Sequence, residues 1–444
     1  MTHKKQPIEQ YLNMLSIEER KDIRALMQRE IIPATGCTEP IAVSLCVAKA
    51  TETLGKIPER IELYLSANVL KNAMGVGIPG TGMIGLPIAV ALGALIGKSE
   101  YGLEVLRDLM PDDVKRGKEY IEEKRIKIEL KNDISDKLYI EVNCFEKEQS
   151  SKAIIRGTHT QFTHIEKNGN ALLLKKGTFG DEEDNLIGDL GRALTFKKVY
   201  DFAVESPIEE LSFILDAAKM NREASRLSKH NNYGHNVAKS ILSQKGQDLF
   251  GDNLHSKMIS STAGACDARM DGALIPVMSN SGSGNQGVAA TLPVLTYAEQ
   301  VGSDEESLIR ALIISHLSVI YIKQYMGRLS ALCGCVMAST GSSCGITYLM
   351  GGTYDNVVYA AKNMIANITG MICDGAKPSC ALKIASGVST ASLSALMAME
   401  DKSVTGQEGI IDDDIDKTIR NLALIGKTGM LETDKIVLDI MTSK

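Results

Sequence analysis

The stretch Cys373-Asp-Gly-Ala-Lys-Pro-Ser-Cys380 places two thiols, a cation and a carboxylate in one short polar turn between apolar segments. Core packing does not require these groups together, so the stretch indicates a functional site. A second cysteine run, Cys333-Gly-Cys335, lies 40 residues upstream. A third segment, Thr35-Gly-Cys-Thr-Glu-Pro40, carries a further cysteine where a helix is predicted to begin. The sequence therefore raises the question of whether these thiols meet in the fold, and around what.

The composition is that of an ordinary soluble globular protein. A chain of 444 residues exceeds the size of one hydrophobic core, and we expect two or three domains. Apolar residues make up 44% and charged residues 23% of the chain. The formal net charge is -6 and there is no long basic run. Nucleic acid is therefore a poor candidate partner.

Two features indicate a cytoplasmic protein without membrane association. The N-terminal residues lack the apolar core of a signal peptide, and the most apolar run, residues 84–96, is too short to span a bilayer. In a reducing compartment, nine cysteines at uneven spacings do not indicate a disulfide framework. Cys46 and Cys144 lie in apolar patterns and are predicted to pack as small hydrophobic residues.

The first part of the chain is predicted to be mixed α/β. Apolar residues recur at helical spacing over residues 8–30, and a second helix is expected to begin near Thr38. A glycine-rich loop from Lys71 to Gly85 leads into an apolar helix, and a charged helix is predicted over residues 112–123. The predicted strands are 59–68, 126–130, 138–145, 153–157, 160–166 and 171–174, with a hairpin turn at Asn168-Gly-Asn.

From about residue 196 the pattern becomes helical, and no convincing strand is present. Alanine, serine, glycine and methionine dominate, which suits closely packed helices. We place the domain boundary near residues 180–200. The predicted helices are 207–226, 236–249, 255–270, 286–301, 305–325, 355–370, 380–398 and 413–425.

The thiols of the second part are candidate metal ligands. Zinc is disfavoured because no histidine lies within fifteen residues of either cysteine run. A [4Fe-4S] cluster needs only three thiolates if its fourth iron is left for substrate, and such an iron is a Lewis acid. Spacing alone leaves three possibilities open, namely a cluster, a zinc site and buried structural cysteines.

Two glycine-rich segments are candidate anion sites, because bare amides before a helix attract negative charge. The segment from Met278 to Gly287 lacks a preceding strand and the lysine of a phosphate-binding loop, so a small carboxylate is the better-sized ligand. A plain glycine-rich turn is the alternative. The Lys71 loop offers a similar but weaker signal. The candidate substrate-binding residues are Lys71, Asn72, Ser281, Gly282, Ser283, Gly284, Asn285 and Gln286.

Cys37 is predicted at a helix N-terminus, where the helix dipole lowers the pKa of a thiol. It is therefore a candidate base, acid or nucleophile. A buried cysteine beside a turn is the alternative.

Five motifs in this order resemble the L-cysteine desulfidase family, which is related to the iron–sulfur L-serine dehydratases. The resemblance extends from about residue 15 to about residue 430. It implies an oxygen-labile [4Fe-4S] enzyme without pyridoxal phosphate that converts L-cysteine and water to pyruvate, ammonia and sulfide. The motifs are Gly36-Cys-Thr-Glu-Pro40, Lys71-Asn-Ala-Met-Gly-Val-Gly-Ile-Pro-Gly80, Ser279-Asn-Ser-Gly-Ser-Gly-Asn-Gln-Gly287, Cys333-Gly-Cys335 and Cys373-Asp-Gly-Ala-Lys-Pro-Ser-Cys380.

By this resemblance Cys333, Cys373 and Cys380 match the cluster-ligand positions, and Cys37 matches the active-site cysteine. Cys335 remains an alternative to Cys333, and Lys377 is a second candidate for the base. The C-terminal residues 441–444 contain no cysteine, so a tail thiol cannot occupy the open iron. L-Serine dehydratase is the alternative enzyme. A cluster-bearing redox sensor is the alternative of another class, although no basic helix-turn-helix is visible.

We therefore predict an α+β fold of two domains. Residues 1–195 form an N-terminal mixed α/β domain with a small sheet, and residues 196–444 form an all-helical domain that carries the cluster. The substrate is a small amino acid bound between the domains. We further expect a homo-oligomer.

Overall fold

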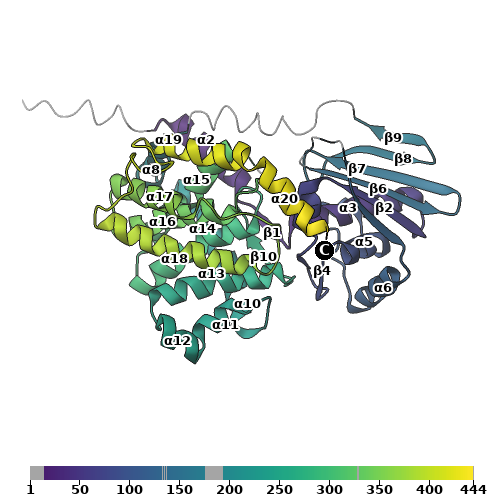
Figure 1. The fold of residues 1–444 in the computed structure, drawn as a ribbon, viewed down its shortest axis with the longest axis horizontal. Coiled ribbons are helices and arrows are strands. Elements are labelled where there is room, and N and C mark those ends of the chain that lie inside the picture. Colours follow the sequence, from purple (N-terminus) through teal and green to yellow (C-terminus); the bar gives the residue numbers. More distant parts are fainter. Residues whose placement is uncertain are drawn as a thin grey trace, which may run out of the picture.

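The computed structural model describes residues 15–132, 134, 136, 138–175, 194–327 and 330–443. Figure 1 shows a body with a β-sheet beside a larger helical body. The predicted mixture of helices with a small sheet is confirmed. The predicted boundary near residues 180–200 falls largely outside the described residues, as does the start of the helix predicted over residues 8–30, so the boundary remains a prediction.

The sheet has six strands in the order β5-β2-β6-β7-β8-β9. β2 and β5 are parallel, and every other neighbouring pair is antiparallel. At the predicted hairpin turn, Asn168 and Gly169 both have positive φ, as a tight turn between β8 and β9 requires. The strands are β2 (Arg60–Leu65), β5 (Ile126–Leu130), β6 (Tyr139–Glu146), β7 (Gln149–Arg156), β8 (Phe162–Lys167) and β9 (Asn170–Leu174).

One face of this sheet is covered by α3 (Thr38–Leu54), and α5 (Leu86–Leu95) and α6 (Pro111–Glu122) form a further layer beyond it (Figure 1). Cys46 on α3 donates to the Ala153 carbonyl of β7 at 3.3 Å. Cys46 and Cys144 are both fully buried in this core, which confirms their predicted packing role. The interior of this body is therefore closed by α3, and the N-terminus of α3 faces away from the sheet toward the helical body.

The helical body is built around α16 (Gly334–Leu349), which packs against α14, α15, α17 and α18. Small residues allow the close approach, since a Cβ at Gly341 would lie 2.3 Å from the Ser315 carbonyl oxygen. α16, α8 and α20 are absent from the predicted helices. The helices of this body are α8 (Phe196–Glu205), α9 (Ile208–Leu211), α10 (Leu215–His230), α11 (Val237–Leu242), α12 (Gln244–Phe250), α13 (Leu254–Met270), α14 (Gly284–Val301), α15 (Glu305–Met326), α16, α17 (Tyr354–Ile368), α18 (Cys380–Met399), α19 (Ile415–Leu424) and α20 (Leu431–Thr442).

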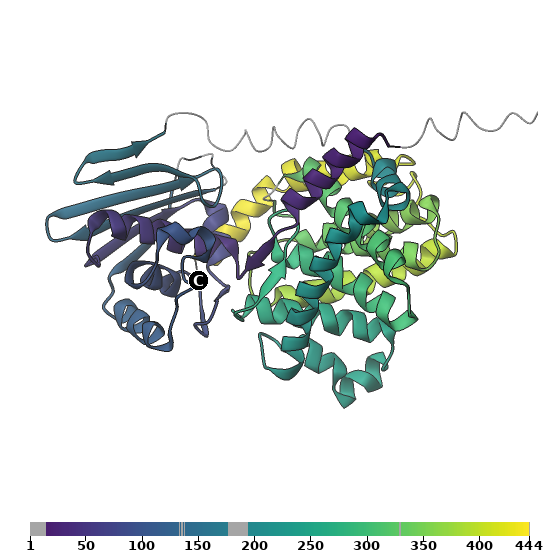
Figure 2. The same ribbon diagram turned by 180° about the vertical axis from the view of Figure 1, so that it is seen from behind.

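Segments from each end of the chain cross between the two bodies. α2 (Ile17–Glu30) packs into the core of the helical body, as Figure 2 shows from behind. β1 (Pro33–Thr35) then pairs antiparallel with β10 (Pro276–Met278). The expectation of no strand in the second part is therefore wrong, because a strand of three residues is too short to show an alternating pattern. At the other end, α20 reaches α4 (Ala67–Ala73) of the sheet body.

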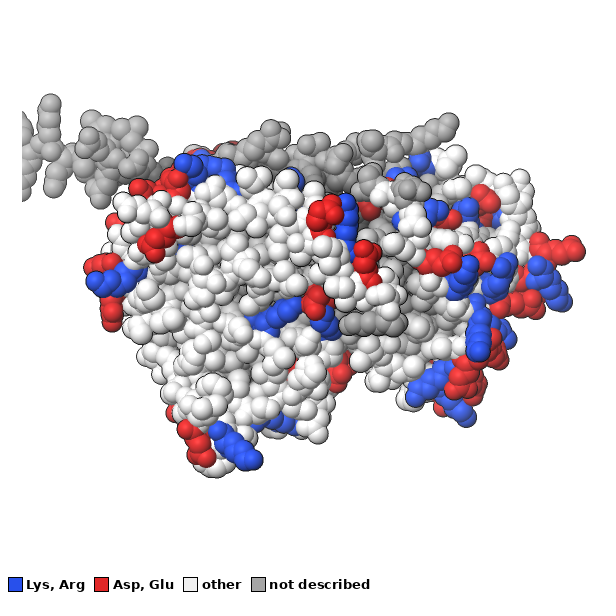
Figure 3. All heavy atoms as spheres, viewed as in Figure 1, with Lys and Arg blue, Asp and Glu red and all other residues white. Residues whose placement is uncertain are grey.

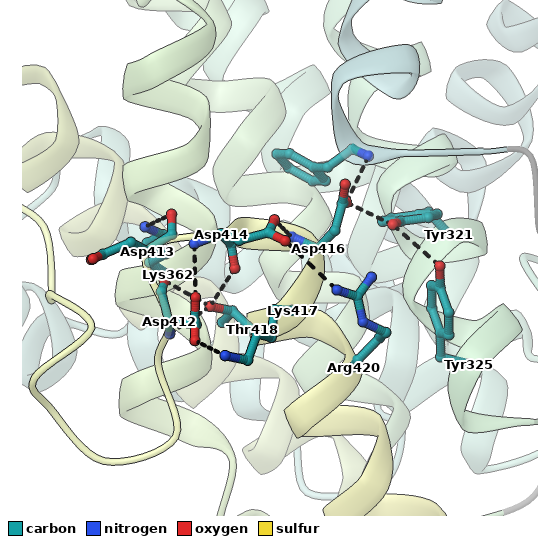
Figure 4. Close-up of polar contacts among 11 residues, drawn as sticks. Tyr321, Tyr325, Lys362, Asp412, Asp413, Asp414, Asp416, Lys417, Thr418 and Arg420 are labelled. Atoms are coloured by element: carbon teal, nitrogen blue, oxygen red, sulfur yellow. Dashed lines mark hydrogen bonds and ion pairs between the residues drawn. The ribbon is translucent and has the colours of Figure 1, made fainter.

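The acidic run before α19 serves as a cap and an anchor (Figure 4). The Asp414 side chain accepts from the Asp416 amide at 2.9 Å and caps α19. The Asp416 carboxylate in turn accepts from the Phe196 amide at 2.9 Å and from the Tyr321 hydroxyl at 2.6 Å. These carboxylates are thus explained by joining α19 to α8 and α15.

Among the described residues, α18 is the one helix long and apolar enough to cross a membrane, with 39% of that stretch buried. It packs against α13, α16 and α17 and leaves the side chains of Leu382, Leu393 and Leu396 exposed. Figure 3 shows few charged side chains on the visible face of the helical body and many more on the sheet body. The expected cytoplasmic location remains a prediction.

Candidate functional site

Cys37 occupies the N-cap position of α3, one residue before the predicted helix start. Its side chain is 5% exposed, and its Sγ donates to Glu39 Oε2 at 2.9 Å. Gly36 has a φ of +69°, and a Cβ there would lie 2.4 Å from Pro79 Cγ. The glycine before Cys37 is therefore required both by its backbone conformation and by the loop that packs on it.

The pKa of the Cys37 thiol is raised well above its ordinary value, first by burial and then by the negative charge of Glu39. The guanidinium of Arg269 opposes this effect. The sequence predicted a lowered pKa from the helix dipole, and that prediction is wrong because desolvation of a buried thiolate outweighs the dipole. Cys37 is therefore protonated at neutral pH, with its proton directed at a carboxylate.

Lys71 and Asn72 lie on helix α4, not in the loop where they were predicted. Asn72 Nδ2 donates to Glu39 Oε1 at 3.0 Å and so orients the carboxylate that faces Cys37. Lys71 is buried and forms an ion pair with Asp434 of α20. Each of these side chains already has a protein partner, and their predicted contact with substrate remains a prediction.

The glycine-rich loop after α4 is used for packing. A Cβ at Gly77 would lie 2.3 Å from the Asp271 carbonyl carbon, and the Gly80 amide donates to Gly272 O at 3.1 Å. A Cβ at Gly75 would lie 3.4 Å from Lys377 Cβ. The loop thus brings the sheet body into contact with the end of α13 and with the stretch that contains Lys377.

Cys333 and Cys373 lie on neighbouring antiparallel segments of the helical body. The Cys333 amide donates to Met371 O at 2.9 Å, and the Cys373 amide donates to Ala331 O at 2.6 Å. Cys380 is the first residue of α18. A Cβ at Gly375, between the latter two thiols, would lie 2.2 Å from Lys71 O, so this turn presses against the sheet body.

The three thiols interact electrostatically. Burial raises the pKa of Cys333 well above its ordinary value, and thiolates at Cys335, Cys373 and Cys380 raise it further. Cys335 has further partners, because its Sγ donates to Lys383 O at 3.2 Å and contacts Ser339 Oγ at 3.4 Å between α16 and α18. Cys335 also acts electrostatically on Cys333 and is affected by Cys380, so the choice of Cys333 over Cys335 as a cluster ligand remains a prediction.

Cys333, Cys373 and Cys380 are the thiols on which the predicted iron–sulfur cluster depends, and the cluster remains a prediction. Within the part of the chain that the structure describes, no three His, Cys, Asp or Glu side chains converge on one metal position. A cluster does not require such convergence, because each thiolate binds a different iron atom. Three free thiols lie on adjoining backbone segments, and two of them, at Cys373 and Cys380, are partly exposed.

Lys377 forms part of a charged group at the same turn. Its Nζ lies 2.5 Å from Asp374 Oδ2, and Lys383 pairs with the other carboxylate oxygen. Partial burial would raise the pKa of Asp374, but the hydrogen bonds from both lysines hold it at about 2. The amine of Lys377 is thus engaged by an anion, and its predicted role as a second base remains a prediction.

The segment Ser279–Gln286 forms the turn that begins α14 at Gly284, earlier than the start predicted near residues 286–288. The Ser283 side chain caps the helix by accepting from the Gln286 amide. Asn280 bonds to His316, whose pKa is lowered to about 3 by burial, so the imidazole is neutral. Among the described residues, the amides of Gly282, Gly284 and Asn285 have no hydrogen-bond partner.

The two glycines of this turn are constrained differently. Gly282 has a φ of +79° and open space at its Cβ position. Gly284 is the first residue of α14 and has no positive φ. A Cβ at Gly284 would instead lie 2.3 Å from Nε of Arg269.

Arg269 and Glu39 were not among the predicted site residues. Arg269 on α13 is 4% exposed; its Nη2 donates to Gly36 O at 2.8 Å and its Nη1 to Asn285 Oδ1 at 3.0 Å. The signal was available, because Arg269 and Asp267 are charged residues in the otherwise small and apolar second half of α13. Glu39 lay inside a quoted motif, but its pairing with Cys37 depends on the cap geometry.

One face of α13 connects the two sets of thiols. Cys266 and Arg269 are three residues apart and share that face. Arg269 acts electrostatically on Cys37, whereas Cys266 is affected by Cys380, Arg269 and Cys335. Arg269 and Cys266, both near the C-terminal end of α13, therefore link Cys37 with Cys380 and Cys335 electrostatically.

Comparison with known proteins supplies a family. The model described as serine dehydratase alpha chain matches residues 100–439. A UPF0597 protein of Bacteroides fragilis is 63% identical over 96% of this chain and 99% of its own length. A UPF0597 protein of Shewanella halifaxensis is 42% identical over 94% of this chain and 97% of its own length.

Proposed function

This chain belongs to the serine dehydratase alpha chain family, and we propose that it is a [4Fe-4S]-dependent L-cysteine desulfidase. Membership of the family indicates a lyase of the serine dehydratase kind. The proposed reaction converts L-cysteine and water to pyruvate, ammonia and sulfide. The choice of cysteine, the cofactor and the residue roles below are parts of the proposal.

The observation that carries the proposal is the arrangement of thiols about α13. A buried cysteine paired with a carboxylate, Cys37 with Glu39, lies near Arg269 of this helix, and Cys380, which interacts with Cys333, lies near Cys266 of the same helix. An elimination that begins at a carbon acid needs a base at the α-proton and an acid at the leaving group. The arrangement supports a site in which Cys37 acts as the base and the cluster held by the three thiols acts as the acid.

Cys333, Cys373 and Cys380 would hold the cluster, leaving one iron without a protein ligand. When bound, the cluster supplies a Lewis acid for the leaving sulfur. Lys377 and Lys383 place positive charge beside these thiols and favour their thiolate forms, because both lower the pKa of Cys380 against the effect of burial. The chain thus provides three thiol ligands and positive charge that opposes the effect of burial on one of them.

Cys37 and Glu39 would move the α-proton. The Glu39 carboxylate accepts the Cys37 proton, and the resulting thiolate removes the α-proton of the substrate. The raised pKa of Cys37 lowers the population of thiolate but makes the thiolate that forms a stronger base toward a weak carbon acid. Asn72 holds Glu39 in the orientation that this transfer requires.

Loss of the α-proton and of sulfide gives aminoacrylate. Aminoacrylate tautomerises to an imine, which water hydrolyses to pyruvate and ammonia. Burial of Cys37 and Arg269 excludes bulk water from the carbon acid before elimination. The hydrolysis itself requires no further residue.

L-Serine dehydratase is the second candidate, and membership of the serine dehydratase alpha chain family favours it. The same base and the same ligands would serve, with hydroxide as the leaving group in place of sulfide. A cluster-bearing redox sensor is a third possibility, of another class. It would retain the thiols and show no turnover.

A single anaerobic assay separates these functions. Purified protein is offered L-cysteine and L-serine side by side, and pyruvate, ammonia and sulfide are measured. We expect sulfide and pyruvate in equal amounts from cysteine, at a higher kcat/KM than pyruvate from serine. A higher kcat/KM for serine would establish the second candidate, and no turnover of either would contradict the proposed function.

A further inference from the structure

Arg269 is a buried cation for which the described residues provide no anion. Its two strong hydrogen bonds go to neutral oxygens, the Gly36 carbonyl and the Asn285 side chain. No carboxylate in the described part of the chain forms an ion pair with it, and its Nε has no hydrogen-bond partner there. A guanidinium that is 4% exposed and unpaired is costly unless a ligand supplies the missing charge.

The first turn of α14 lies against this guanidinium. Gly284 is the first residue of α14, and Nε of Arg269 lies 2.3 Å from the place that its Cβ would occupy. The amides of Gly284 and Asn285 have no acceptor among the described residues. Two sources of positive potential, a helix N-terminus and a buried cation, therefore meet at one small volume.

This volume adjoins both sets of thiols. Arg269 bonds to the residue before Cys37 on one side. On the other side, the buried Gln286 side chain packs at the start of α16, because a Cβ at Gly334 would lie 3.0 Å from Gln286 Cδ. Gly334 directly follows Cys333. A ligand bound at this turn thus lies between the proposed base and the proposed cluster ligands.

We propose that Arg269, together with the Gly284 and Asn285 amides, binds the α-carboxylate of the substrate, and that Arg269 thereby restricts the enzyme to free α-amino acids. This inference rests on the proposed function for the identity of the ligand. A planar guanidinium recognises a carboxylate in a two-point arrangement that a lysine cannot reproduce. Cysteine and serine share this carboxylate, so Arg269 contributes equally to the binding of both.

The test uses a ligand that cannot react. L-Alanine has the same carboxylate and ammonium as the substrates but no leaving group, and L-alaninamide differs from it by loss of the negative charge. Binding of each to anaerobically purified enzyme is measured by calorimetry. We expect wild-type enzyme to bind L-alanine at least about 10-fold more tightly than L-alaninamide, and Arg269→Met to lose that difference.

Turnover supplies a second measurement. Arg269→Lys is expected to raise KM about 10²-fold for L-cysteine and L-serine alike and to change kcat much less. The positive charge remains in this variant, but the two-point hydrogen bonding of a guanidinium to a carboxylate is lost. Arg310→Met is the matched control, since Arg310 is a mostly buried arginine that already pairs with Glu306 and bonds to the Ala203 carbonyl. It should lower thermal stability without changing the preference for L-alanine.

Two results would overturn the inference. The first is wild-type enzyme that binds L-alaninamide as tightly as L-alanine, a comparison that needs no folded variant. The second is Arg269→Lys with unchanged KM values. In contrast, enzyme that binds L-alanine through Arg269 but releases neither sulfide nor ammonia from any substrate would contradict the proposed function and leave the carboxylate site intact.

Discussion

Cys37 and the Cys373–Cys380 turn place the same side chain in two opposite settings. Cys37 is buried against the Glu39 carboxylate, and both burial and that charge raise the pKa of its thiol. Cys373 and Cys380 are partly exposed; burial still raises the pKa of the Cys380 thiol, and Lys377 and Lys383 oppose that rise. An acid neighbour favours a protonated thiol that can take part in proton transfer, whereas basic neighbours favour the thiolate that iron requires. The difference shows that the neighbours decide the chemistry of a cysteine.

The largest expected effect comes from the turn. Cys373→Ser and Cys380→Ser should each abolish the brown colour and all turnover, because a hydroxyl is a poor ligand for iron in a cluster that has only three protein ligands. Iron content and the visible absorbance spectrum of anaerobically purified protein are the measurements. Wild-type protein should contain about four irons per chain. Colourless wild-type protein with full activity would show that these thiols serve another purpose.

Cys37→Ala should have the opposite signature. Iron and colour remain, and kcat falls by at least about 10²-fold because the proton-transfer group is lost. The fold should be little affected, since the Cys37 side chain makes no capping hydrogen bond at α3. Steady-state kinetics and iron analysis of the same preparation test this expectation. A near-normal kcat would show that Cys37 is only a packing residue. The contrast between Cys37 and the Cys373–Cys380 turn would then have no catalytic meaning.

Glu39→Gln tests the acid neighbour by itself. We expect kcat to fall about 10-fold, a smaller loss than for Cys37→Ala, because the thiol remains while its proton acceptor is weakened. Activity that depends on the Cys37 thiolate rises with pH through the pKa of that thiol. Glu39 raises this pKa, so its neutralisation should move the rising limb of the pH–rate profile to lower pH.

Glu52→Gln is the control for that profile. Glu52 lies on the same helix, is exposed and pairs with Lys49 away from Cys37. Its replacement should leave the profile unchanged. A limb that moves equally in both variants, or in neither, would show that Glu39 does not act on the catalytic thiol.

The smallest effect is expected at Cys335. Cys335→Ser should retain iron and lose less than about 3-fold in kcat, because a hydroxyl can keep the hydrogen bond to the Lys383 carbonyl between α16 and α18. Unfolding in denaturant should show a loss of about 1 kcal/mol. Loss of iron in Cys335→Ser, with iron retained in Cys333→Ser, would show that Cys335 and not Cys333 is the cluster ligand.

The elements with strong local patterns were predictable. The strands of the sheet, the hairpin at Asn168 and the helix that begins at Thr38 follow from alternation, turn residues and first-turn preferences. α16 was missed because its residues are small and it is buried on all sides, so it has no polar face to mark a helical period. β10 was missed because its three residues pair only with a segment more than 200 residues away.

The candidate site also has a part that was visible in the sequence and a part that only the fold shows. The cysteines, the carboxylate beside Cys37 and the two glycine-rich loops were visible as motifs, because unusual residue types at close spacing need no fold to be noticed. The two loops looked alike in sequence. In the structure the glycines after α4 allow backbone packing against Asp271, whereas the turn before α14 leaves amides without partners. Glycine permits both uses, and only the neighbouring backbone decides between them.

Long-range contacts settled the remaining questions. The hydrogen bond from Cys335 to the Lys383 carbonyl depends on how α18 packs against α16. The raised pKa of Cys37 depends on burial beneath the other body, which no local pattern reports. Arg269 became a candidate only when α13 brought it against Gly36 and Gly284, residues far apart in the chain. Side-chain identity is local, but desolvation and charge pairing arise from the whole fold, and they determine what each of these residues can do.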